Sequence, residues 1–214
     1  MSKGRRVGKV AGWSFALVGL LLAGLVAWMV VPILTSSPQG SSGQALDVEG
    51  YPLEVSATGD DGRTRVLEAA LESDDSRGLD QLIAGDRIVV TGSGYDAGSG
   101  IYVAICRVPE GPDQKPGPCL GGVPATTPDG DATVGVIQWA PSNWINDDWA
   151  WRLFGARSFD DPEAGTFQAY IEVPGSRDES VDCRDVRCGL FTRNDHTKLE
   201  DRVQDLYLPV AFAG

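Results

Sequence analysis

The chain has 214 residues, of which 42% are hydrophobic and 22% charged, a composition typical of a globular protein rather than a disordered one. Four cations lie among the first nine residues. The other 14 cations and all 30 acids follow residue 34, which gives that region a net charge of −16. Such a charge repels a nucleic-acid backbone, so no nucleic acid is expected as a partner. The chain has one histidine, His196, and none of the common nucleophile or zinc-protease motifs, so we expect no enzyme.

A run of 25 uncharged residues, 10–34, lies near the N-terminus. About 20 apolar residues suffice to cross the hydrocarbon core of a bilayer. The run exceeds the roughly 7–15 residues of a signal-peptide core, and residues 32–35 offer no small-x-small cleavage site. An uncleaved anchor is therefore preferred over a cleaved signal peptide. Because the cations precede the run, residues 1–9 are predicted to be cytoplasmic, residues 10–34 transmembrane, and the remainder outside the cell, in a single-pass protein of the cell membrane.

Residues 35–46 begin with a stretch rich in Ser, Gly and Pro and are predicted to be a flexible linker to one extracytoplasmic domain, 47–214. In that domain, short alternating apolar runs separated by turn signals predict seven β-strands. The runs lie at 53–57, 88–90, 101–105, 134–136, 167–173, 188–192 and 206–212. Seven antiparallel strands predict an all-β sandwich of two sheets, with a small barrel as the alternative. Pro209 predicts that the last strand is an edge.

Two connections, 59–85 and 139–165, are too long to be turns. The first contains the sequence RVLEAALES at 65–73, for which about two helical turns in a solvent-exposed excursion are predicted. The second, the Trp-rich segment, holds every tryptophan that follows the N-terminal run. Because tryptophan is enriched at binding hot spots, ligand or partner contact is predicted for Trp139, Trp144, Trp149, Trp151 and Phe154. The alternative is that the segment folds back and its indoles form a small satellite core.

The four cysteines all follow the N-terminal run, and an even number outside the cytoplasm favours disulfides. Of the three possible pairings, the two local ones are preferred. Cys106–Cys119 would join a strand to the hairpin after it, and Cys183–Cys188 would close a four-residue loop. Neither spacing is C-x-x-C and the chain has one histidine, so no zinc site is expected.

Residues 181–189, VDCRDVRCG, resemble the V-D-C-x4-C element of the neocarzinostatin family, the secreted chromophore-carrying apoproteins of actinomycetes. Residues 85–106 resemble the strand, turn and cysteine strand of that family. Residues 192–212 are similar to the closing segment of immunoglobulin-like modules in actinobacterial surface proteins, some of which accompany haem-transport-associated domains. The resemblance covers roughly residues 47–214 and implies an immunoglobulin-like sandwich with two local disulfides, in agreement with the seven strands predicted from the alternating runs. In the carrier apoproteins, a cleft beside one sheet holds an apolar chromophore.

Polar residues gather around His196, and three interpretations are open for them: a structural loop, a calcium site, or haem ligation through His196 or a neighbouring tyrosine. The loop is preferred because Asn and Asp form turns, cations interleave with the acids, and no D-x-D-x-D-G spacing occurs. No metal and no cofactor are therefore assigned, with haem kept as an alternative. The residues concerned are Asn194, Asp195, His196, Glu200, Asp201 and Asp205.

Together these features predict a non-enzymatic binding module, an outward-facing immunoglobulin-like domain that presents loops from a membrane anchor. Its partners are then the membrane, through residues 10–34, and a protein or small molecule that contacts the Trp-rich segment. The alternative function is a small-molecule carrier, for haem or an apolar chromophore, that uses a cleft beside this segment.

Overall fold

A computed structural model describes residues 4–35, 37–72, 77–122 and 138–213, with helix side chains described from Phe15 onward except at 29 and 32. The chain divides into two compact units, 1–36 and 37–214, which we describe separately. The first unit contains one helix, α1 (Gly4–Thr35), whose described apolar side chains other than Ile33 are exposed, as at Leu21. Within the described part of the chain, no helix is both long enough and apolar enough to cross a membrane.

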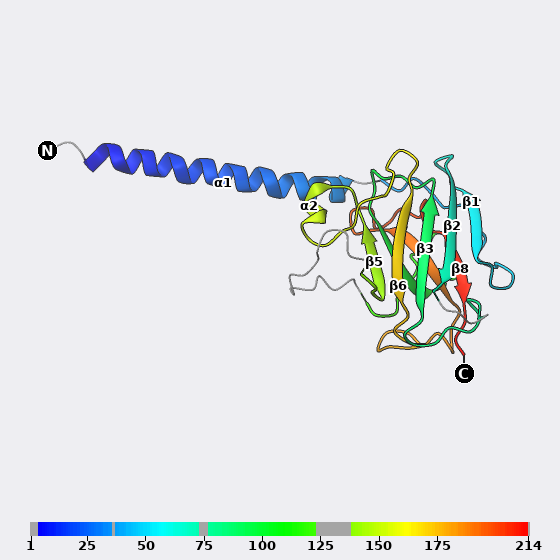
Figure 1. The fold of residues 1–214 in the computed structure, drawn as a ribbon. Coiled ribbons are helices and arrows are strands. Elements are labelled where there is room, and N and C mark those ends of the chain that lie inside the picture. Colours follow the sequence, from blue (N-terminus) through cyan, green and yellow to red (C-terminus); the bar gives the residue numbers. More distant parts are fainter. Residues whose placement is uncertain (1–3, 36, 73–76, 123–137, 214) are drawn as a thin grey trace. The chain divides into compact units, whose positions relative to one another are not determined.

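The second unit, hereafter the head, consists of two four-stranded antiparallel sheets (Figure 1). The first sheet has the order β1 (Glu54–Thr58), β2 (Thr64–Leu71), β3 (Arg87–Ser93), β6 (Phe167–Glu172). The second has the order β5 (Ser142–Ile145), β4 (Ile101–Arg107), β7 (Cys188–Asn194), β8 (Tyr207–Val210). A single helical turn, α2 (Trp149–Arg152), follows β5. The predicted all-β architecture of two sheets is confirmed, and β8 is an edge strand as Pro209 indicated.

The core lies between the two sheets, because each strand directs alternate side chains inward. Leu67 and Val90 of the first sheet and Val103, Leu190 and Leu208 of the second are fully buried members of one cluster. The alternation that predicted strands in the sequence is therefore the alternation that fills the core.

The structure has eight strands among its described residues, so the prediction of seven was wrong. Residues 65–71 of the RVLEAALES segment lie in β2 and do not form helical turns, with Arg65, Leu67 and Ala69 buried while Glu68 is exposed. Its pairing with both β1 and β3 overrides the helix preference of Leu, Glu and Ala. Strand β5, inside the Trp-rich segment, was not predicted, and the predicted strand at 134–136 lies outside the described residues.

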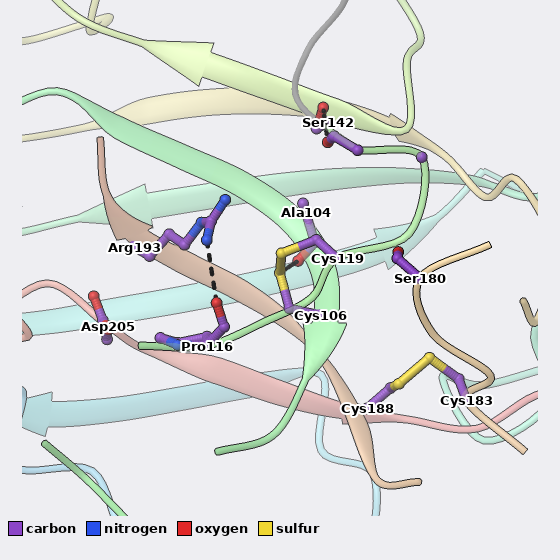
Figure 2. Close-up of a disulfide and its surroundings, with 12 residues drawn as sticks. Ala104, Cys106, Pro116, Cys119, Ser142, Ser180, Cys183, Cys188, Arg193 and Asp205 are labelled. Carbon is purple, nitrogen blue, oxygen red and sulfur yellow. Dashed lines mark hydrogen bonds between the residues drawn. A yellow bond between two sulfur atoms is a disulfide. The ribbon is translucent and has the colours of Figure 1, made fainter. Parts of the chain in front are cut away.

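Both predicted disulfides, Cys106–Cys119 and Cys183–Cys188, are present (Figure 2). The first joins β4 to the segment after it, where Arg193 of β7 donates a hydrogen bond to the Pro116 carbonyl at 3.1 Å (Figure 2). Both bridges lie at the same end of the sandwich, since Arg107 at the end of β4 pairs with Cys188 at the start of β7. We call this the disulfide end.

The opposite end carries the β1–β2 turn, the β3–β4 and β7–β8 connections, and α2. Strand register establishes this grouping, because Ile101 at the start of β4 pairs with both Ile145, the last residue of β5, and Asn194, the last residue of β7. We call it the α2 end.

The segment 40–46, which was predicted to be part of the flexible linker, is bonded to the head. The Gly40 carbonyl accepts a hydrogen bond from the Arg202 backbone N–H at 3.1 Å. Ser41 exchanges two bonds with Asp60, at 2.7 and 3.0 Å, and the Gln44 amide bonds both the N–H and the C=O of Tyr207 at 2.7 Å. The chain therefore joins the head at the α2 end, and residues 36–39 alone separate that junction from α1.

Candidate functional site

Hydrogen bonds at its base hold the Trp-rich segment against the α2 end. Backbone N–H groups of Asn146 and Arg157 donate to the carbonyls of Arg157 and Trp144, at 2.7 and 2.8 Å respectively. The Asp148 carboxylate caps α2 by accepting the Ala150 N–H at 2.9 Å. The segment thus returns alongside β5 and presents α2 in a defined position.

Four rings meet at this end, from four separate parts of the chain: Tyr102 of β4, Trp144 of β5, Trp151 of α2 and His196 of the β7–β8 connection. We call them the aromatic cluster. The His196 ring lies 4.7 Å from Trp151 and 5.3 Å from Trp144, centroid to centroid, in edge-to-face geometry. The Tyr102 hydroxyl is 2.9 Å from His196 Nδ1. Trp144 is buried, while the other three rings are half-buried. The sequence interpretation treated His196 and the tryptophans as separate candidates, and the fold brings them together.

Asp195, which is fully buried, joins the β7–β8 connection to β5 and to the residue that follows β5. Its Oδ2 accepts hydrogen bonds from Trp144 Nε1 at 2.9 Å and Asn146 Nδ2 at 2.8 Å. Its Oδ1 accepts from the Thr197 N–H at 2.8 Å and the Thr197 hydroxyl at 2.6 Å. Both oxygens are therefore committed to protein donors, and Asp195 is a positioning residue. A buried tryptophan side chain needs a hydrogen-bond acceptor for its indole N–H. This requirement is the one sequence signal that could have predicted an acidic partner for Trp144.

Tyr102 is the cluster member that sequence reasoning missed. Burial, followed by the charge of Asp195, raises the pKa of Tyr102 to about 12, so its hydroxyl stays protonated at neutral pH. The Arg193 guanidinium lies 5.6 Å from the Tyr102 ring centroid, and burial lowers the pKa of Arg193. The alternation of residues 101–106 predicts that Tyr102 lies on the face opposite the core. It does not predict which side chains Tyr102 contacts on that face.

The five predicted contact residues do not form one surface. Trp139 lies apart from the aromatic cluster. Its ring packs edge-to-face on Tyr170 of β6, with the ring centroids 5.3 Å apart, and the Arg87 guanidinium carbon lies over it at 5.1 Å from the ring centroid. Trp144 is buried in the cluster and Trp151 is half-buried there. Trp149 and Phe154 are exposed by 60% and 55%, and Leu153 by 74%. We call Trp149, Leu153 and Phe154 the apolar patch.

The polar residues around His196 bond within the protein. Asn194 Nδ2 donates to the Asp201 carbonyl, and Asp201 Oδ1 accepts the Val203 N–H. Glu200 is exposed. Within the described residues, no group of three or more His, Cys, Asp or Glu side chains could hold a metal ion. The calcium interpretation therefore gains no support from the geometry.

Asp205 forms a buried ion pair with Arg202, whose Nη1 lies 2.8 Å from Asp205 Oδ2. The other oxygen, Oδ1, is buried and has no hydrogen-bond partner in the described structure. Burial raises the pKa of Asp205 to about 7, although the charges of Arg202 and Arg193 oppose this. Since the Arg202 N–H also bonds the Gly40 carbonyl, this pair lies where the chain joins the head.

Three cavities of the described structure lie away from the aromatic cluster. One of about 290 Å³ opens on the outer face of β1–β3, between Glu54 and Val89. One of about 430 Å³ lies beside β8 and the Cys183–Cys188 loop, and a third of about 20 Å³ is lined in part by Asp205 and Gln44. None of these three includes a residue of the Trp-rich segment.

Comparisons with family models, curated proteins and solved structures found no match for this chain. The functional argument therefore depends on the geometry of the head and on the sequence.

Proposed function

We propose that the chain is a membrane-anchored, extracytoplasmic binding module whose contact surface is at the α2 end. The 25-residue uncharged run with cations on its N-terminal side alone supports the anchor and its orientation. The uncharged run begins at Val10, whereas the side chains of α1 are described from Phe15 onward. The run is therefore longer than the part of it whose side chains the structure describes. The two disulfides support an oxidising compartment for the head.

The observation that carries the binding role is the apolar patch. Leu153 and Phe154 are large, apolar and exposed by more than half, and they follow a capped helical turn that is bonded at its base. Exposed apolar side chains on a fixed scaffold are typical of interaction surfaces, because a soluble fold gains nothing from leaving them in water. The immunoglobulin-like identity of the sandwich, suggested by the sequence resemblance, belongs to the same proposal.

Orientation is tested by external proteolysis of intact cells that produce the full chain with a different epitope tag at each terminus. The C-terminal tag should be lost and the N-terminal tag retained. Retention of both tags in intact cells that lose both after permeabilisation would overturn the outward orientation. A mature N-terminus near residue 36 by mass spectrometry would overturn the anchor.

A haem carrier is the second candidate function, and the geometry of His196 favours it. Nδ1 bonds to Tyr102, and Nε2 has no hydrogen bond among the described residues, which fixes the nitrogen that a metal would bind. The test is titration of the purified chain with haem. Under this second function a Soret shift appears and is lost in His196→Ala but kept in Trp139→Ala, a change remote from the cluster. Under the first function no shift appears.

A further inference from the structure

We propose that the apolar patch inserts into the interfacial region of the same membrane that holds α1, so that the first partner of the α2 end is lipid. This inference rests on the anchor in the proposed function and names what the contact surface binds. It follows from where the chain joins the head, how short the connection is, and which side chains are exposed there.

The connection limits how far the junction can move from the membrane. The uncharged run ends at residue 34 and α1 ends at Thr35, whereas Gly40 is already bonded to Arg202 of the head. Six residue steps from residue 34 to Gly40, at about 3.3–3.6 Å each, give a reach of at most about 22 Å. The head region around Gly40 therefore stays within about 22 Å of the end of the uncharged run.

The junction and the apolar patch belong to the same end of the sandwich. Gly40 is bonded to the β7–β8 connection and Ser41 to the β1–β2 turn through Asp60. The β7–β8 connection also provides His196, whose ring packs on Trp151 of α2. The limit on the reach therefore applies to the α2 end and not to the disulfide end.

The composition of the exposed turn suits a lipid interface. Tryptophan and phenylalanine, with leucine, prefer the boundary between headgroups and acyl chains, and arginine places its charge among the headgroups. Trp149, Leu153 and Phe154 are exposed there, and the exposed Arg152 lies between them in sequence. An interfacial element buries its apolar face roughly 5–10 Å into this boundary, a depth that one helical turn with large side chains can provide.

The experiment places a fluorescent label on single added cysteines in the full chain, reconstituted into vesicles of zwitterionic phospholipid. All four native cysteines are in disulfides, so the added thiol is the one that reacts. The labelled variants are Leu153→Cys in the patch, Ile83→Cys at the disulfide end and Leu25→Cys in α1. Ile83 is the matched control because it is also an exposed apolar side chain, at 46%. Quenching is measured with iodide in water and with nitroxide-bearing lipid.

We expect the Leu153→Cys label to be quenched by the lipid nitroxide and protected from iodide, as the Leu25→Cys label is, while the Ile83→Cys label shows the reverse. Addition of Phe154→Asp to Leu153→Cys should restore iodide quenching at position 153. If Leu25→Cys reports lipid but Leu153→Cys reports water, the lipid contact is wrong and the anchor stands. If Leu25→Cys itself reports water, the anchor in the proposed function is wrong. Protection of position 153 from both quenchers would indicate a protein contact, such as a second copy, and would overturn the lipid assignment.

Discussion

The two ends of the sandwich are stabilised in different ways. The disulfide end has two covalent cross-links between residues close in sequence, and Asp178 organises a turn there by accepting N–H groups of Ser180 and Val181. The α2 end has neither disulfide and depends on buried polar side chains, chiefly Asp195 and the Arg202–Asp205 pair. Covalent links constrain the unfolded chain, whereas buried acceptors stabilise one folded arrangement of loops. The end that carries the candidate surface is therefore stabilised by buried hydrogen bonds and an ion pair, and not by covalent cross-links.

The largest effect is expected from Asp195→Ala, which removes the acceptor for four donors on Trp144, Asn146 and Thr197. Leaving buried donors unsatisfied should lower the free energy of unfolding by about 4 kcal/mol. Chemical denaturation followed by tryptophan fluorescence measures this change. The control, Glu163→Ala on the exposed surface, should shift the same value by less than about 0.5 kcal/mol. Equal effects of the two changes would refute the role of Asp195.

Removal of the disulfides should destabilise the chain next most strongly. Replacement of Cys106 and Cys119 by serine, which opens a loop of sequence separation 13, should cost about 3 kcal/mol. The same change at Cys183 and Cys188, with separation 5, should cost about 2 kcal/mol because loop-closure entropy grows with length. Denaturant midpoints of the two double variants provide the comparison. The reverse order would show that strain or packing, not loop length, dominates.

The pH dependence of stability should contain a contribution from Asp205. Burial raises its pKa to about 7 in the folded chain, against about 3.9 in the unfolded chain, so the folded state binds more protons between these values. This contribution is complete below about pH 4 and is lost as the pH rises through 7, by up to about 1.4 kcal/mol per pH unit. Asp205→Asn should flatten the unfolding free energy between pH 5 and 7.

Asp61 provides the contrast in that experiment. Its pKa is lowered, first by hydrogen bonds from the buried Arg65, so its stabilisation is present above about pH 4 and is lost below. The window from pH 5 to 7 therefore isolates Asp205. An unchanged slope in Asp205→Asn would mean that Asp205 stays ionised in the folded chain.

The smallest effect concerns the aromatic cluster. Tyr102→Phe removes the hydroxyl that bonds His196 Nδ1 and should cost about 1 kcal/mol, since water can reach this half-buried pair. Near-ultraviolet circular dichroism should change as well, because His196 contacts both Trp144 and Trp151. Tyr170→Phe, which removes a hydroxyl bonded to the exposed Gln168, should leave that spectrum near wild type.

The sequence predicted the parts of the fold that local patterns determine. Alternation found strands such as β4 and β6, and spacing found both disulfides. It failed at β2, where Leu, Glu and Ala favour a helix in isolation and pairing on both edges decides otherwise. It also failed to unite Tyr102, Trp144 and His196, because their proximity depends on strand register across β4, β5 and β7. No local pattern encodes that register.

The last strand illustrates how the fold protects one edge of a sheet. Along the outward edge of β8, the N–H and C=O of Tyr207 are occupied by Gln44, and Pro209 has no N–H to offer. The next outward residue, Ala211, is bonded on both sides, to Leu79 and Leu82. A neighbouring copy therefore finds no continuous row of open backbone groups on this edge to extend the sheet. Protection of the β8 edge against pairing with another strand thus follows from a few side-chain and loop bonds close to where the chain enters and leaves the sandwich.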